Sequence, residues 1–159
     1  MKKLFVMVVG LIALLIAGCS NDVNKTHHEA EHNKESFPPT YAGWIHVNGK
    51  KYEMEAGGYQ WERKKGLTTE TVQTDHASPN QVAEKLQAIQ LEPNMNMGIK
   101  VEENPEIFVY LWNEHGRDKE IMLKNNEMAA PTNKGRYIFE VLARWTNGEV
   151  SYTFVVEVN

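Results

Sequence analysis

The chain of 159 residues contains a single cysteine, so it can form neither an internal disulfide nor a cysteine-rich metal centre. It also lacks an excess of positive charge, and its formal charge of −4 argues against nucleic-acid binding, which needs a basic face to replace counterions. Glycine-rich phosphate-binding loops and the G-x-S-x-G elbow of hydrolases are absent as well. We therefore expect no cofactor and no nucleic-acid partner, and a length typical of one domain with short additional segments.

Long hydrophobic runs are also missing, apart from one at the start of the chain. Lys2 and Lys3 precede residues 4–17, which are uncharged and mostly apolar. This run is shorter than the roughly 20 apolar residues that a transmembrane helix needs. Basic residues followed by a short apolar run are typical of a secretory leader. The alternative is an uncleaved signal anchor.

The residues that end this run, Ile16-Ala17-Gly18-Cys19, resemble the lipobox of bacterial lipoproteins. The resemblance implies that residues 1–18 are a lipoprotein signal peptide and that Cys19 becomes the mature N-terminus, linked to diacylglycerol through a thioether. Two acyl chains anchor a protein stably, whereas one does so only marginally. The implied location is the cell membrane, with the protein lipid-anchored and facing outward. Removal of residues 1–18 leaves 15 basic against 21 acidic residues, a formal charge of −6.

Residues 19–36 have almost no apolar side chains, because Val23 and Ala30 are the only ones after the cysteine. Such a segment cannot offset the entropy of its own ordering, so we expect a flexible polar tether. Phe37-Pro38-Pro39 then stiffens the chain and marks the edge of a domain that covers residues 37–159.

Apolar residues recur at every second position through most of this domain, which is the spacing of β-strands. Residues 137–145 and 150–158 are expected to form a hairpin around Asn147-Gly148, and residues 44–47 and 51–55 a second one around Asn48-Gly49, because Asn-Gly suits a type I′ turn. Further strands are expected at residues 59–63, 67–73, 98–102, 107–112, 120–123 and 127–130.

One segment departs from this spacing. Ser78 supplies an N-cap, Pro79 a first helical residue and Gln81 the capping-box partner, so we expect one short α-helix at about residues 79–90. The pattern as a whole predicts a mainly β fold, an antiparallel β-sandwich. Residues 135–143 resemble the G-x-Y-x-x-x-V-x-A strand of immunoglobulin-like sandwiches, in which the tyrosine, here Tyr137, can close a corner. The whole chain resembles small uncharacterised lipoproteins of Bacillus-type bacteria, for which the comparison implies no activity.

The predicted tether contains the pattern H-E-x-x-H at residues 28–32. In zinc peptidases this spacing places two imidazoles on one face of a helix beside a general base. Here it lies in a polar segment without apolar periodicity or an identifiable third ligand, so we expect a solvated tether and no peptidase. Loose divalent-metal binding by His27, His28 and His32 is the alternative.

Two further groups contain residue types with possible chemistry. Asp75, His76 and Ser78 match the members of a hydrolase triad, but close neighbours at a helix start cannot readily adopt that geometry, and capping explains Asp75 and Ser78 better. Met95 and Met97 offer thioethers that suit Cu(I), although core or loop filling is the favoured interpretation. No catalytic residue is therefore predicted.

The aromatic residues, including Tyr110 and Trp112, are expected mostly to fill the space between the sheets. Gly57, Gly58, Tyr59 and Trp61 are instead a possible recognition loop, because paired glycines allow a sharp bend and Tyr and Trp are common binding anchors. This stretch resembles the G-Y-x-W loop of chagasin-type cysteine-protease inhibitors.

Three functions follow from these observations. The leading hypothesis is a non-enzymatic, membrane-anchored lipoprotein that binds a protein or an envelope component through the loops of its sandwich. One alternative is a protease inhibitor that uses residues 57–61, and the other is a metal-binding lipoprotein that uses residues 27–32.

Overall fold

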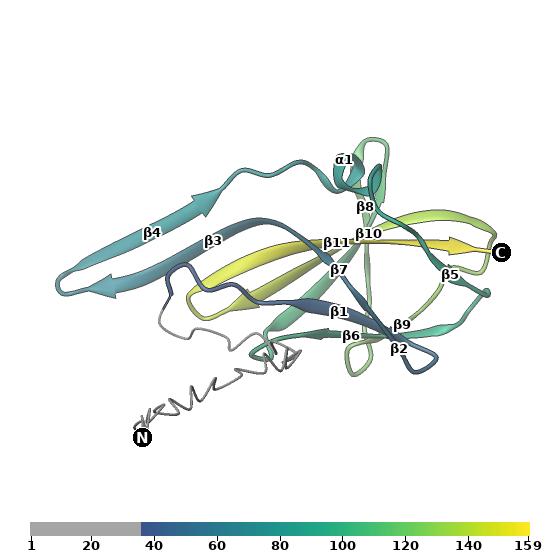
Figure 1. Cartoon of the computed structure of the whole chain (residues 1–159), viewed down its shortest axis with the longest axis horizontal. Helices are drawn as coiled ribbons and strands as arrows, with labels where there is room; N and C mark the ends of the chain where they lie inside the picture. The colour runs from purple at the N-terminus through teal and green to yellow at the C-terminus, as the bar shows by residue number, and fades with distance from the viewer. Residues whose placement is uncertain (1–35) are drawn as a thin grey trace, which may run out of the picture. The chain divides into compact units, whose positions relative to one another are not determined.

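The computed structural model describes residues 36–159, most of which belong to two packed β-sheets (Figure 1). The predicted signal peptide and all of the predicted tether before Ser36 lie outside the described residues. The predictions for Cys19 and for the histidines His27, His28 and His32 therefore also lie outside them.

The smaller sheet has four antiparallel strands in the order β2-β1-β6-β9. They are β1 (Gly43–Val47), β2 (Lys50–Glu53), β6 (Asn96–Val101) and β9 (Glu127–Ala129). Asn48 and Gly49 connect β1 to β2 with φ values of 50° and 71°, the left-handed conformation that a type I′ turn requires. The predicted Asn48-Gly49 hairpin is confirmed.

The larger sheet has seven strands, six of them in the order β4-β3-β11-β10-β7-β8. They are β3 (Glu55–Lys65), β4 (Thr68–Thr74), β7 (Glu106–Asn113), β8 (Gly116–Ile121), β10 (Gly135–Trp145) and β11 (Gly148–Val158). The seventh, β5 (Ile89–Leu91), lies parallel to the end of β11, beyond the part that pairs with β3. The sequence did not predict β5.

The two sheets share one hydrophobic core, so the predicted mainly β sandwich is confirmed. Ile45 and Met97 from the smaller sheet and Phe139 and Val156 from the larger one are buried in the same cluster. Each such side chain contributes about 1.5–3 kcal/mol through burial. The Tyr137 hydroxyl donates a 2.9 Å hydrogen bond to the carbonyl of Asn133, which is the corner contact expected from the sequence. The finer, immunoglobulin-like assignment stays a prediction.

The helix is shorter than predicted, because α1 comprises only Pro79–Ala83. The backbone N–H of Lys85 bonds to the carbonyl of Val82 and that of Leu86 to Ala83, so the chain tightens at once into i to i−3 bonds. Ile89, expected on the helix, is instead the first residue of β5 and is buried in the core. The apolar positions that suggested a longer helix are divided between one turn of helix and a strand.

The β10–β11 hairpin is present, but its turn differs from the prediction. Trp145 pairs with Gly148, so Thr146 and Asn147 form the turn, and neither Asn147 nor Gly148 has a positive φ. Gly148 lies instead against the ring of Trp61, and a Cβ on it would stand only 2.5 Å from the carbonyl oxygen of Gln60. Glycine is therefore required here for close packing and not for a left-handed turn.

Candidate functional site

The predicted recognition loop lies inside a strand. Gly57, Gly58, Tyr59 and Trp61 all belong to β3, and the Trp61 side chain is fully buried. The two glycines lie where the register of β3 with β11 shifts, and a Cβ on Gly57 would stand 3.2 Å from the carbonyl oxygen of Ser151. These glycines permit two strands to approach closely. The prediction of a loop is therefore wrong, and protease inhibition through residues 57–61 stays a prediction.

The aromatic residues of β7 lie on the outer face of the larger sheet. Phe108, Tyr110 and Trp112 alternate along β7 with Val109 and Leu111, which belong to the core or pack against it. The prediction that the rings of Tyr110 and Trp112 fill the space between the sheets is therefore wrong. Both faces of β7 carry apolar side chains, so the sequence period does not show which face is buried.

These three rings adjoin four residues on the neighbouring strands, and together they form the surface that we call the aromatic face. Its members are Phe108, Tyr110, Trp112, Arg117, Glu140, Leu142 and Arg144. The strands β7, β8 and β10 supply them all.

The carboxylate of Glu140 is the buried centre of this face. Arg117 donates two hydrogen bonds to it, from Nε at 2.7 Å to Oε2 and from Nη2 at 2.8 Å to Oε1. Trp112 Nε1 donates to Oε2 at 2.7 Å and Ser151 Oγ to Oε1 at 2.9 Å. Four donors occupy the four acceptor positions of a carboxylate. The Glu140 carboxylate therefore has no acceptor position left for a further donor, and it holds Arg117, Trp112 and Ser151 in place around it.

Two opposing influences set the charge of Glu140. Burial is the largest, and it disfavours the ionised carboxylate. The hydrogen bonds from Arg117, Trp112 and Ser151 act in the other direction and together outweigh it, so the pKa of Glu140 lies below its ordinary value. The same contact raises the pKa of Arg117. Both groups are charged at neutral pH, and the ion pair holds Arg117 in place.

Arginine side chains stack on the rings of the aromatic face. The guanidinium carbon of Arg117 lies 4.3 Å from the centre of the Tyr110 ring, and that of Arg144 lies 5.1 Å from the centre of Phe108. Arg144 also pairs with Glu149 at 3.1 Å. The face thus presents alternating flat aromatic and cationic groups, which are typical of residues that anchor protein interfaces.

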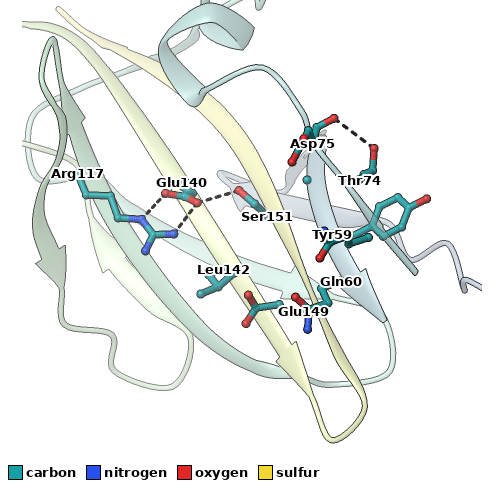
Figure 2. Close-up of a pocket in the computed structure, with 11 residues that line it drawn as sticks. Tyr59, Gln60, Thr74, Asp75, Arg117, Glu140, Leu142, Glu149 and Ser151 are labelled. Carbon is teal, nitrogen blue, oxygen red and sulfur yellow. Dashed lines mark hydrogen bonds and ion pairs between the residues drawn. The ribbon is translucent and has the colours of Figure 1, made fainter. Parts of the chain in front are cut away.

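A hollow of about 270 Å³ opens beside Glu140. Figure 2 shows Arg117 and Ser151 approaching the carboxylate from opposite sides, with Leu142 below them. The remaining walls are mostly polar and include Gln60, Gln73, Thr74, Asp75 and Glu149. Small-molecule sites usually enclose about 300–1,000 Å³. The volume of this polar hollow lies just below that range.

The residues of the suggested hydrolase triad do not form a hydrogen-bonded triad. Within residues 36–159, no hydrogen bond joins the side chains of Asp75, His76 and Ser78. Ser78 caps α1 instead, in a capping box with Gln81, which confirms the capping prediction for Ser78. Asp75 lies in the wall of the hollow and is not part of that cap.

The two methionines of the suggested copper site, Met95 and Met97, differ in their burial. Met97 is fully buried in β6, which confirms core filling for that residue. Met95 packs partly against the core, and its sulfur accepts a 3.3 Å hydrogen bond from Asn48. In the part of the chain that the structure describes, no group of three or more His, Cys, Asp or Glu residues could hold a metal ion. Metal binding by residues 27–32 stays a prediction.

Sequence reasoning missed Glu140 and Arg117. One signal was available: Glu140 lies between Phe139 and Val141 in a strand with apolar residues on both sides of it. A lone acid in such a strand has to be paired if both faces are covered.

The fold and this face define a β-sandwich with an organised outer surface. Comparison with family models, curated proteins and solved structures finds no match to this chain. Among residues 36–159, no helix is long and apolar enough to cross a bilayer.

Proposed function

We propose that this chain is a non-enzymatic, extracytoplasmic binding protein that is anchored to the cell membrane by diacylglycerol on Cys19. The leader and the lipobox-like residues 16–19 support the anchor. The binding role rests chiefly on one observation, the three rings of β7 that lie side by side with stacked arginines on the outer sheet face.

The aromatic face favours a protein as the partner. Tyr, Trp, Phe and Arg are the residue types enriched in protein interfaces and in their hot spots. The Glu140 network fixes Arg117 and Trp112 before any partner arrives, which lowers the entropy lost on binding. The binding surface proposed is therefore a sheet face, whereas the sequence had suggested the loops.

A photo-crosslinking residue at Tyr110 tests this proposal in intact cells. The matched control is Trp44 of β1, an aromatic residue that also lies beneath a cation, Lys51, but on the smaller sheet. We expect a crosslinked adduct of one defined mass at position 110, none at position 44, and loss of the adduct when Arg144→Glu is added.

Four results would contradict the proposal. Equal adducts at both positions, or an adduct that survives Arg144→Glu, would mean that the aromatic face is not the binding surface. An adduct that resists proteases and is degraded by a glycan hydrolase would exclude a protein partner. Turnover of a substrate by residues 37–159 in a broad hydrolase screen would exclude the non-enzymatic class.

A further inference from the structure

The β3–β4 hairpin ends in an exposed apolar side chain. Trp61 pairs with Gly148 at the start of β11, and the backbone N–H of Glu62 still bonds to the carbonyl of Asn147; beyond Glu62, β3 is paired only with β4. Figure 1 shows this hairpin projecting past the other strands of the larger sheet. Gly66, with a φ of 65°, and Leu67 form its turn, and Leu67 is fully exposed. A projecting tip therefore carries a leucine that contacts no other part of the described domain.

Three basic residues lie just before this leucine in the chain. Arg63, Lys64 and Lys65 form the only run of three basic residues in a chain whose formal charge is −4. Glu70, across the hairpin, lies 2.8 Å from Arg63 and 3.9 Å from Lys65. Lys64 has no ion-pair partner among the described residues, so the tip keeps a positive charge. We call residues 63–67 the basic tip.

The basic tip lies close to the point where the described chain begins. The guanidinium of Arg63 stacks on the ring of Phe37, 4.3 Å from its centre. From Arg63 to Gly66 the strand advances only about 10 Å. Between Cys19 and Phe37 the chain can span at most about 60 Å, even when fully extended. A lipid on Cys19 would thus keep a bilayer surface within reach of the basic tip.

A cationic flank with one exposed leucine suits the interface of an anionic membrane. Lysine and arginine are attracted to acidic headgroups, and an apolar side chain gains free energy by entering the boundary with the acyl chains. The acidic charge of the whole chain does not prevent this, because screening limits each interaction to about 10 Å at ordinary salt. The rest of the chain carries a net negative charge, so an anionic membrane favours the orientation in which the basic tip points toward it.

We propose that the basic tip is a second membrane contact, in which Leu67 enters the interface of an anionic phospholipid bilayer while Lys64 and Lys65 lie at the headgroups. This inference rests on the proposed lipid anchor for its role in cells. Two attachment points orient the domain, whereas a lipid on a tether alone would let it rotate.

A fluorescent label at position 67 tests the contact without the lipid. Residues 37–159 contain both sheets and the whole buried core, so this part is expected to fold alone. They contain no cysteine, since Cys19 is the only one, and Leu67→Cys therefore provides a unique site for a polarity-sensitive dye. The matched control is Met122→Cys, at the other exposed large hydrophobic side chain of the described residues.

We expect the dye at position 67 to shift to the blue with phosphatidylglycerol-containing vesicles and to be unchanged with pure phosphatidylcholine vesicles or with soluble glycerol phosphate. The dye at position 122 should be unchanged throughout. No shift at position 67, or equal shifts at both positions, would overturn the proposal. A shift with glycerol phosphate alone would mean a phosphate site and not a bilayer contact.

Co-sedimentation with the same vesicles measures the contribution of charge. Lys64→Gln with Lys65→Gln should weaken binding by about 10- to 30-fold. The control pair is Lys50→Gln with Lys51→Gln, two lysines beside the Asn48-Gly49 turn of the smaller sheet, which should change binding less than twofold. Equal losses in both pairs would contradict a specific tip.

The two proposals fail separately. Absence of lipid on Cys19 with vesicle binding intact would overturn the anchor and leave the hairpin contact standing. Lipid on Cys19 with no vesicle binding by residues 37–159 would overturn the hairpin contact alone.

Discussion

Replacement of Arg117 by methionine tests whether the buried carboxylate organises the aromatic face. Methionine retains much of the aliphatic stem but removes the two hydrogen bonds from Nε and Nη2, at 2.7 and 2.8 Å. Glu140 then keeps only Trp112 and Ser151 as donors. Because its side chain is 5% exposed, water cannot readily replace the lost partner.

The expected cost follows from this burial. Removal of one partner of a buried ion pair typically costs about 3–5 kcal/mol. Since the Arg117 side chain is itself 45% exposed, we take the lower end and expect a loss of about 3 kcal/mol in the free energy of unfolding at neutral pH. Arg144→Met is the control, because its partner Glu149 is 41% exposed, and it should cost less than about 1 kcal/mol.

The effect of Arg117→Met should depend on pH. In the wild type the pKa of Glu140 is lowered, so its ionisation adds stability above the ordinary value of 4.5, and this is lost as the pH falls through the folded-state pKa. Without Arg117, burial is opposed by fewer donors, and the pKa of Glu140 should be higher than in the wild type. The difference in stability between wild type and variant is therefore largest at neutral pH and shrinks in acid.

Urea unfolding of residues 37–159, followed by tryptophan fluorescence at neutral and acid pH, measures both effects. A loss no greater than that of Arg144→Met would refute the role assigned to the Glu140 network. A large loss that does not change with pH would show that the cost comes from packing and not from charge.

Two further substitutions test the fold. Gly148→Ala should destabilise the domain by at least about 2 kcal/mol in the same unfolding assay, because its methyl group would overlap the ring of Trp61. The control is Gly98→Ala, which has no neighbour closer than 3.8 Å and should change the free energy of unfolding by less than about 0.5 kcal/mol. Similar values for the two variants would contradict the packing role of Gly148. Tyr137→Phe removes the hydrogen bond to Asn133 and should lower the free energy of unfolding by about 1 kcal/mol, which is measured as a lower thermal midpoint. An unchanged midpoint would mean that this corner contact adds no stability.

Local patterns in the sequence were sufficient for the fold class. The alternation along β10 and β11, and Asn48-Gly49 between β1 and β2, depend on neighbours in the chain, so they are visible without the structure. The helix was overextended because Ile89 continues the helical spacing but is buried as a strand against β11. Long-range pairing decided that residue, and no local pattern reports it.

The aromatic face could not be predicted for a similar reason. Arg117 and Glu140 are 23 positions apart in the chain, and Trp112 and Glu140 are 28 apart. Their meeting depends on the order β10-β7-β8, which the sequence does not reveal. The side of the sheet on which Tyr110 lies likewise depends on its register with β10. Residue types were visible, but their common location was not.

The lipid on Cys19 is tested most directly by metabolic labelling of the full-length protein in bacterial cells with an alkyne fatty acid. The proposed anchor predicts a labelled wild-type protein in the membrane fraction and an unlabelled Cys19→Ser variant that keeps residues 1–18. Because the chain contains no other cysteine, a wild type without label, or a Cys19→Ser variant that is still labelled, would contradict the anchor.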